Sequence, residues 1–189
     1  MPVVDPERAR LIELLRQTAV KSAPEPIFRL ASGKMSRHYV DCKQALSDPE
    51  ARGLIGSLAG RLIAENHFDA IGGLELGAYP IAIAISDALF RTRGVRLRVF
   101  VVRKQPKSHG ITDLIAGNVA AGDRTLIVDD VVTTAASTIK AIEGARRAGL
   151  VVAEAMALVD REEENGRANL ESLGVRFAAL FRLRDLLEL

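Results

Sequence analysis

Leu126-Ile-Val-Asp-Asp-Val-Val-Thr-Thr-Ala-Ala-Ser-Thr138 decides how this chain folds, because it joins an apolar strand, two acids and a helix start. The three branched apolar residues at its beginning are typical of a strand that is covered on both faces. An unpaired buried charge costs much free energy. We therefore expect Asp129 and Asp130 at the carboxyl end of the strand, where it emerges from the core.

A hydroxyl-rich turn follows the two acids and leads into an expected helix. Thr133, Thr134, Ser137 and Thr138 supply hydroxyls and N–H groups close to the helix N-terminus. That end of a helix attracts phosphate. Acceptors for sugar hydroxyls or a metal thus stand next to donors for a phosphate, a pairing that suits a sugar phosphate. The alternative is a strand end with two solvated acids and a capping hydroxyl.

Strands and helices alternate on both sides of this segment. Further strands are expected at 68–73, 95–102, 151–159 and 175–180, and helices at about 80–89 and 137–148. This alternation predicts an α/β fold whose central sheet is mostly parallel and flanked by helices. In such sheets the ligand lies in a crevice beyond the carboxyl ends of the strands.

The N-terminal part has a different pattern. Asp5-Pro6-Glu7 and Asp48-Pro49-Glu50 each resemble a helix start with an N-cap, a Pro in the first turn and an acid. Residues 28–41 between them predict a hairpin with its turn near Ser32-Gly33. We expect a small hood over the crevice. The chain would be one domain, 1–189, with the hood at roughly 1–45 and the core at 46–189.

Composition excludes several classes of protein. The net charge of +2 does not favour broad nucleic-acid binding, and the single Cys42 allows no internal disulfide and fits a reducing compartment. No apolar run is long enough for a membrane span, and we expect no secretory signal in the first residues. The three scattered His residues and one Cys cannot form a soft-ligand zinc site. Mg²⁺ held largely by substrate oxygens is compatible with the acids.

A second candidate site is the basic segment Arg103-Lys-Gln-Pro-Lys-Ser-His-Gly110, which follows a predicted strand. Its Pro, Ser and Gly disfavour a helix or strand, so we expect a loop that can close over a polyanion and exclude water. With the phosphate turn, such a loop suggests transfer or expulsion of a highly charged group. The alternative is a solvated basic loop.

A third candidate is Asp160-Arg161 at the end of the 151–159 strand. Its guanidinium fork could bind a carboxylate at two points, and the alternative is a surface ion pair of little consequence. Gly72-Gly73 and Gly77 follow another strand end and would let backbone approach a ligand closely. Their spacing matches neither a dinucleotide fingerprint nor a Gly-Lys-Ser/Thr phosphate loop.

These segments together resemble a known family. Residues 128–137 resemble the phosphoribosyl pyrophosphate motif of type I phosphoribosyltransferases. Arg103-Lys104 with Lys107 and His109-Gly110 resembles the catalytic loop of the orotate phosphoribosyltransferase family, residues 30–41 resemble its hood, and Val159-Asp-Arg161 resembles its orotate-contacting segment. The matches follow one another in family order over residues 28 to 162.

The resemblance implies a type I phosphoribosyltransferase-like fold and a cytoplasmic homodimer that works in pyrimidine biosynthesis. The implied reaction is orotate plus phosphoribosyl pyrophosphate to orotidine 5′-phosphate plus pyrophosphate, with Mg²⁺ as cofactor and no dedicated protein ligand set for the metal. The basic loop of one subunit would reach into the site of its partner.

The resemblance also implies roles for individual residues. The implied catalytic residues are Lys104, Lys107, His109, Asp129 and Asp130, of which the two acids hold the ribose hydroxyls. The implied phosphoribosyl pyrophosphate site adds to these Arg103, Val131, Val132, Thr133, Thr134, Ala135, Ala136 and Ser137. Thr133 and Arg161 would contact orotate, with Arg161 on its carboxylate.

The chain also departs from the family pattern. The phosphate turn of the family usually has Gly at the position of Ala135, and often also at the position of Ala136. In the hood, Ala31 stands where some relatives have Lys, and Arg37 stands where Pro is usual. Ser108 stands where an acid is common. Two other functions therefore stay open: a phosphoribosyltransferase for a different base, and a regulator that senses phosphoribosyl pyrophosphate without catalysis.

Overall fold

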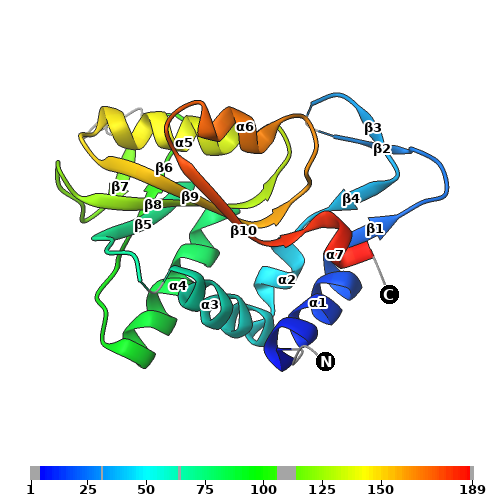
Figure 1. Cartoon of the computed structure of the whole chain (residues 1–189), viewed down its shortest axis with the longest axis horizontal. Coiled ribbons are helices and arrows are strands. Elements are labelled where there is room, and N and C mark those ends of the chain that lie inside the picture. Colours follow the sequence, from blue (N-terminus) through cyan, green and yellow to red (C-terminus); the bar gives the residue numbers. More distant parts are fainter. Residues whose placement is uncertain (1–4, 31, 64, 106–113, 188–189) are drawn as a thin grey trace.

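The structure is a computed structural model that describes residues 5–30, 32–63, 65–105 and 114–187. These residues form a six-stranded sheet with helices on both faces (Figure 1). In spatial order the strands are β10 (Arg176–Arg182), β9 (Val151–Asp160), β8 (Arg124–Val132), β5 (Ala70–Leu74), β6 (Arg98–Val102) and β7 (Ile115–Gly117). Only β7 runs antiparallel to its neighbour among these strands. The predicted α/β fold with a mostly parallel, helix-flanked sheet is confirmed.

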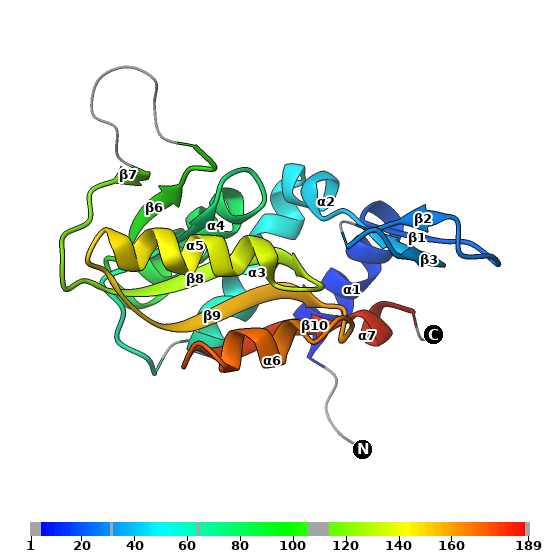
Figure 2. The same ribbon diagram turned by 90° about the horizontal axis from the view of Figure 1, so that it is seen from above.

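The helices divide into two layers, which the sheet separates (Figures 1 and 2). One layer contains α1 (Pro6–Thr18), α2 (Lys43–Ser47), α3 (Pro49–Ile63), α4 (Ala78–Arg93) and α7 (Leu183–Leu187). The other contains α5 (Ala136–Arg147) and α6 (Gly166–Glu171). Within the described residues, no helix combines the length and the apolar character that a membrane crossing requires.

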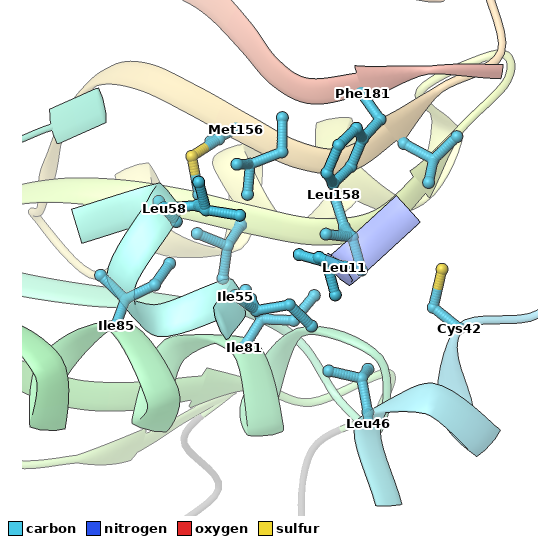
Figure 3. Packing of buried hydrophobic residues seen from close by; sticks show 14 of the residues in the cluster. Leu11, Cys42, Leu46, Ile55, Leu58, Ile81, Ile85, Met156, Leu158 and Phe181 are labelled. Atoms are coloured by element: carbon cyan, nitrogen blue, oxygen red, sulfur yellow. The ribbon is translucent and has the colours of Figure 1, made fainter. Parts of the chain in front are cut away.

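The alternation of side chains along β8 builds a core on each face. Leu126 and Val128 join the larger cluster with α1, α3 and α4, whereas Ile127 joins the smaller one with α5. Figure 3 shows the aliphatic packing of the larger cluster, in which Leu11, Ile55 and other branched side chains meet. Each such side chain contributes roughly 1.5–3 kcal/mol on burial. The centre of the sheet is therefore a firm base for the residues at its carboxyl edge.

Both predicted helix starts are confirmed. The Asp5 carboxylate accepts hydrogen bonds from the N–H groups of Glu7 and Arg8 at 3.0 and 3.4 Å, and α1 begins at Pro6. Asp48 accepts in the same way from the Glu50 N–H at 2.7 Å before α3. Each Asp satisfies N–H groups that have no acceptor inside the helix.

The N-terminal strands differ in part from the expected hairpin. β2 (Phe28–Arg29) and β3 (Met35–Ser36) pair antiparallel around a turn in which Gly33 has φ 87°. The predicted hairpin extends to Asp41, but the observed one ends at Ser36. Instead β4 (His38–Val40) pairs with β1 (Val20–Ser22), because the chain crosses to the strand that follows α1. We call β1–β4 the hood strands. The division of the chain into a hood and a core stays a prediction.

Candidate active site

The ends of four parallel strands, and the loops that follow them, lie at the carboxyl edge of the sheet. The Arg161 N–H after β9 donates to the Val132 carbonyl at the end of β8, at 3.0 Å. The Lys104 N–H after β6 donates to the Glu75 carboxylate after β5, at 2.9 Å. Ligands of parallel sheets bind at this edge. The candidate residues after these strands therefore belong to one region of the molecule.

Asp129 lies inside strand β8 and is only 6% exposed, so the expectation that it emerges from the core is wrong. Its side chain faces α5, where the Thr138 hydroxyl donates to its Oδ2 at 2.7 Å. Burial, and then the charge of Asp130, raises the pKa of Asp129 to about 7. The hydrogen bond from Thr138 and the uptake of a proton offset the free-energy cost of burying Asp129.

Asp130 lies on the other face of the strand, beside the start of α4, because successive side chains alternate. A Cβ on Gly77 would lie 2.8 Å from the Cγ and Oδ1 of Asp130. Gly77 itself has φ −71°, which any residue can adopt. Glycine is therefore required here for the room that the Asp130 carboxylate occupies. The expected close approach of this loop to a ligand stays a prediction.

The hydroxyl-rich turn after β8 contains a strained residue. Ala135 has φ 64° and ψ 14°, in the left-handed region, and α5 begins at Ala136. The departure from glycine therefore matters at Ala135, whereas Ala136 has ordinary helical geometry. The Thr134 hydroxyl accepts from the Ala136 N–H at 3.2 Å. The next N–H groups, of Ser137 and Thr138, open the helix, where a phosphate finds donors.

Arg161 lies at the end of β9, but it is buried, so a solvated surface ion pair is excluded. Its side chain is 2% exposed, and Nε and Nη2 donate to the Glu163 carboxylate at 3.1 and 3.2 Å. Nη2 also donates to the Ser36 hydroxyl and the His38 carbonyl, each at 3.2 Å. The guanidinium thus joins the carboxyl edge of the sheet to the hood strands, and one edge of its fork already holds a carboxylate.

Of the basic segment, the structure describes only residues 103–105. The Arg103 N–H donates to the Leu114 carbonyl at 2.8 Å, and Lys104 is exposed. Lys107 and His109 lie outside the described residues, as does Ala31 in the hood.

For three residues of this region, the sequence pattern did not predict the role that the structure shows. Thr138 was expected as a phosphate donor, but its hydroxyl serves Asp129. Glu163 and Ser36 were not singled out, although both bind Arg161. The only signal in the sequence was the short distance of Glu163 from Arg161 along the chain.

Comparison with known proteins gives a consistent picture. The model of the phosphoribosyl transferase domain family matches residues 43–170. A relative from Aquifex aeolicus (strain VF5), an orotate phosphoribosyltransferase, is 45% identical over 181 residues, which are 96% of this chain and 98% of that protein. The chain belongs to the orotate phosphoribosyltransferase family.

Solved structures of orotate phosphoribosyltransferases share its fold. The Mycobacterium tuberculosis H37Rv enzyme in complex with Fe(III) dicitrate has a TM-score of 0.81 and 35% identity, covering 96% of this chain and 99% of that one. The same enzyme in complex with 5-phospho-α-D-ribosyl 1-diphosphate has a TM-score of 0.77 and 34% identity, with the same coverage. In this chain the matched range 43–170 contains both acids, the turn and Arg161, whereas the hood strands lie outside it.

Proposed function

We propose that this chain transfers the phosphoribosyl group of 5-phosphoribosyl 1-diphosphate to orotate, which yields orotidine 5′-phosphate and pyrophosphate in the synthesis of UMP. The observation that carries the proposal is the meeting of an acid pair, a helix N-terminus and a buried arginine at one edge of the sheet. Together they offer partners for a ribose, a phosphate and a carboxylate. The relatives are named orotate phosphoribosyltransferases, and one was solved with 5-phospho-α-D-ribosyl 1-diphosphate, which contains a ribose and phosphates.

The reaction breaks the bond between ribose C1 and the pyrophosphate oxygen and forms a bond from C1 to an orotate nitrogen, whose proton passes to the leaving pyrophosphate or to water. Positive charge develops on the ribose, and the adjacent carboxylates of Asp129 and Asp130 stabilise it more in the transition state than in the ground state. A pKa of about 7 for Asp129 allows a nearby developing cation to favour its ionised form. Burial thus places this charge where little water screens it.

The remaining roles follow the family pattern and are part of the proposal. Val131 to Ser137 bind the 5-phosphate and ribose, with Thr133 also beside the base, and Arg161 binds the orotate carboxylate. Arg103, Lys104, Lys107 and His109 hold the pyrophosphate as it leaves. Cations around the leaving group lower the barrier to its departure.

The proposal includes Mg²⁺. Across the described residues no group of three or more His, Cys, Asp or Glu side chains is placed to hold a metal ion. The Asp129 carboxylate accepts from Thr138 of α5 and the Asp130 carboxylate lies beside Gly77, so a cation at this site would be coordinated mainly by substrate oxygens and water. Bound there, Mg²⁺ supplies charge neutralisation to the pyrophosphate. Chelation is expected to stop turnover.

Orotate-dependent release of pyrophosphate with Mg²⁺ tests the proposal, with uracil, adenine and hypoxanthine as competing bases. Turnover with another base alone would indicate a different phosphoribosyltransferase, and binding of phosphoribosyl pyrophosphate without turnover would indicate a sensor. Lys107→Ala should abolish most turnover. Lys140→Ala, at an exposed position of α5, serves as the matched control.

The proposal also includes a homodimer in the cytoplasm. The free, buried thiol of Cys42 supports a reducing compartment. Mixing inactive Lys107→Ala and Asp130→Asn subunits tests the dimer. If the basic loop serves the partner's site, each mixed dimer regains one complete site. If it serves its own subunit, mixing restores nothing.

A further inference from the structure

The Arg161 guanidinium is a buried cation with an internal counter-charge. Its side chain is 2% exposed, so it has little access to bulk water. Glu163 binds the Nε and Nη2 edge in the two-point geometry that a carboxylate ligand would use. No acceptor for Nη1 is found among the described residues, and no fully buried side-chain nitrogen or oxygen there lacks a partner. The accessible donor of the fork is therefore Nη1.

The loop that carries Glu163 has an unusual backbone. Glu162, Glu164 and Asn165 all have positive φ values, of 56°, 55° and 58°, although none is glycine. Residues in the left-handed region persist only where their surroundings hold them there. Backbone hydrogen bonds on both sides of Glu163 do so: the Glu162 N–H donates to the Asp160 carboxylate at 2.9 Å, and the Gly166 N–H donates to the Glu163 carbonyl at 3.3 Å. Exposed ion pairs of Glu164 with Lys34 and of Glu162 with Arg182 and Arg184 flank the turn. The chain thus turns back so that Glu163 reaches Arg161.

Glu163 also lies at the boundary with solvent. Its side chain is 37% exposed, whereas that of Arg161 is buried. Ser36 and His38 bind the guanidinium independently, through Nη2. Arg161 therefore keeps two anchors when the charge of Glu163 is removed, and Glu163 is the only acid bonded to it among the described residues.

We infer that Glu163 is a positioning and specificity-determining residue, which orients Arg161 and supplies its counter-charge. This inference rests on the proposed function. A carboxylated pyrimidine meets a cation that Glu163 has partly neutralised, and its carboxylate lies near a second negative charge. A pyrimidine without a carboxylate leaves Arg161 paired, so its binding strands no buried charge. Glu163 thus limits the preference for the carboxylated base.

The test compares orotidine 5′-phosphate with uridine 5′-phosphate, which differs from it only by lacking the carboxylate. Dissociation constants of both are measured by titration calorimetry for the wild-type chain, Glu163→Gln and Glu162→Gln. Glu163→Gln is expected to raise the preference for orotidine 5′-phosphate about tenfold, because an uncompensated cation attracts the carboxylate and penalises its absence. Within the described part of the chain, Glu162 pairs only with the exposed Arg182 and Arg184, so Glu162→Gln should leave the preference unchanged.

The outcomes separate the inference from a structural role and from the proposed function. If Glu163→Gln binds both nucleotides more weakly by the same factor, and its preference stays within about twofold of wild type, then Glu163 only supports the local structure and the inference is overturned. Glu163→Met keeps the length without the charge, and it is expected to raise the preference too if the Gln variant does not fold. A wild-type chain that turns over no orotate and binds neither nucleotide would overturn both proposals.

Discussion

The two sides of the site are built from different forces. On the β8 side, the acids and the turn into α5 rest on strand hydrogen bonds and on buried apolar side chains of both core clusters. On the hood side, Arg161 donates single hydrogen bonds to Ser36 and His38 of the hood strands and pairs with Glu163, and Glu164 pairs with Lys34 in the turn between β2 and β3. Packed interiors resist displacement, whereas exposed ion pairs contribute little.

If the proposed function holds, the difference teaches how one site can combine firmly held catalytic groups with a more weakly held base pocket. Groups that stabilise developing charge must be held close to their productive positions. Groups that admit and release a base gain from weaker ties. We expect substitutions on the β8 side to change stability and turnover strongly. On the hood side, substitutions at the exposed ends of the ion pairs, Lys34 and Glu163, should cost less stability, and Glu163→Gln should change base preference.

The pH dependence of stability is expected to show the largest effect on the β8 side. The pKa of Asp129 is raised to about 7, above its unfolded value near 3.8, mainly by burial. The folded chain therefore binds the proton more tightly, and the free energy of unfolding falls as pH rises from about 4 to about 7. The loss is on the order of a few kcal/mol, since one pKa unit is about 1.4 kcal/mol.

Urea unfolding of the wild-type chain and Asp129→Asn across this range checks the prediction. The Asn variant should lose the decline, because it cannot titrate. Asp123→Asn is the matched control at the other end of β8. The Ala120 N–H lowers the pKa of Asp123, so its contribution is lost only in acid, and the decline towards pH 7 should remain. Parallel curves for wild type and Asp129→Asn would contradict the prediction.

Gly77→Ala is expected to have the next largest effect. The added Cβ would lie 2.8 Å from the Asp130 Oδ1, so the carboxylate must turn away while the backbone stays in place. Displacing a reacting group by about an ångström costs roughly 100-fold in kcat/KM, or about 2.7 kcal/mol. Steady-state kinetics with phosphoribosyl pyrophosphate measure it.

Gly53→Ala on α3 is the control for this substitution, because a Cβ there meets no atom within 4 Å. It should stabilise the helix by roughly 0.5–1 kcal/mol and leave turnover unchanged. Wild-type kcat/KM in Gly77→Ala would mean that the β8 side tolerates displacement, and the comparison of the two sides would lose its basis.

Sequence patterns predicted the parts of this molecule that depend on local order. The alternation of strands and helices gave the sheet, and Asp-Pro-Glu twice marked a helix start. The apolar run before Asp129 correctly indicated a strand covered on both faces. Local preference and burial agree in these segments, so a short window of sequence is enough.

The errors concern residues whose environment comes from distant parts of the chain. Asp129 is buried because Thr138 and proton uptake offset the cost, and neither is visible from the charge alone. β4 pairs with β1 across the intervening hairpin. Glu163 reaches Arg161 because Glu162, Glu164 and Asn165 adopt positive φ, and none of these residue types predicts such a turn from the sequence. Tertiary partners decide each of these cases.

A pair of substitutions in the phosphate turn sharpens the comparison with a smaller effect. Ala135 is in the left-handed region and Ala136 opens the helix α5. Left-handed geometry costs a residue with a Cβ roughly 1–2 kcal/mol, and glycine in a helix costs about 0.5–1 kcal/mol relative to alanine. Because the entropy cost of glycine is common to both variants, Ala135→Gly should be more stable than Ala136→Gly by roughly 1–2 kcal/mol in thermal and urea unfolding. Equal stability of the two variants would mean that no strain is held at Ala135.

The smallest effect is expected at the tie between the hood and the Glu163 loop. The Lys34 ammonium lies 2.8 Å from the Glu164 carboxylate, but the Lys34 side chain is 70% exposed. Water and salt screen such a pair, so Lys34→Ala should lower the free energy of unfolding by less than about 0.5 kcal/mol. Urea unfolding at low and high salt measures it, with Lys140→Ala as the exposed control. A loss above about 1 kcal/mol would show that the hood side is fixed as firmly as the β8 side. In that case, breaking the Lys34–Glu164 pair would not be enough to let a base enter the proposed site.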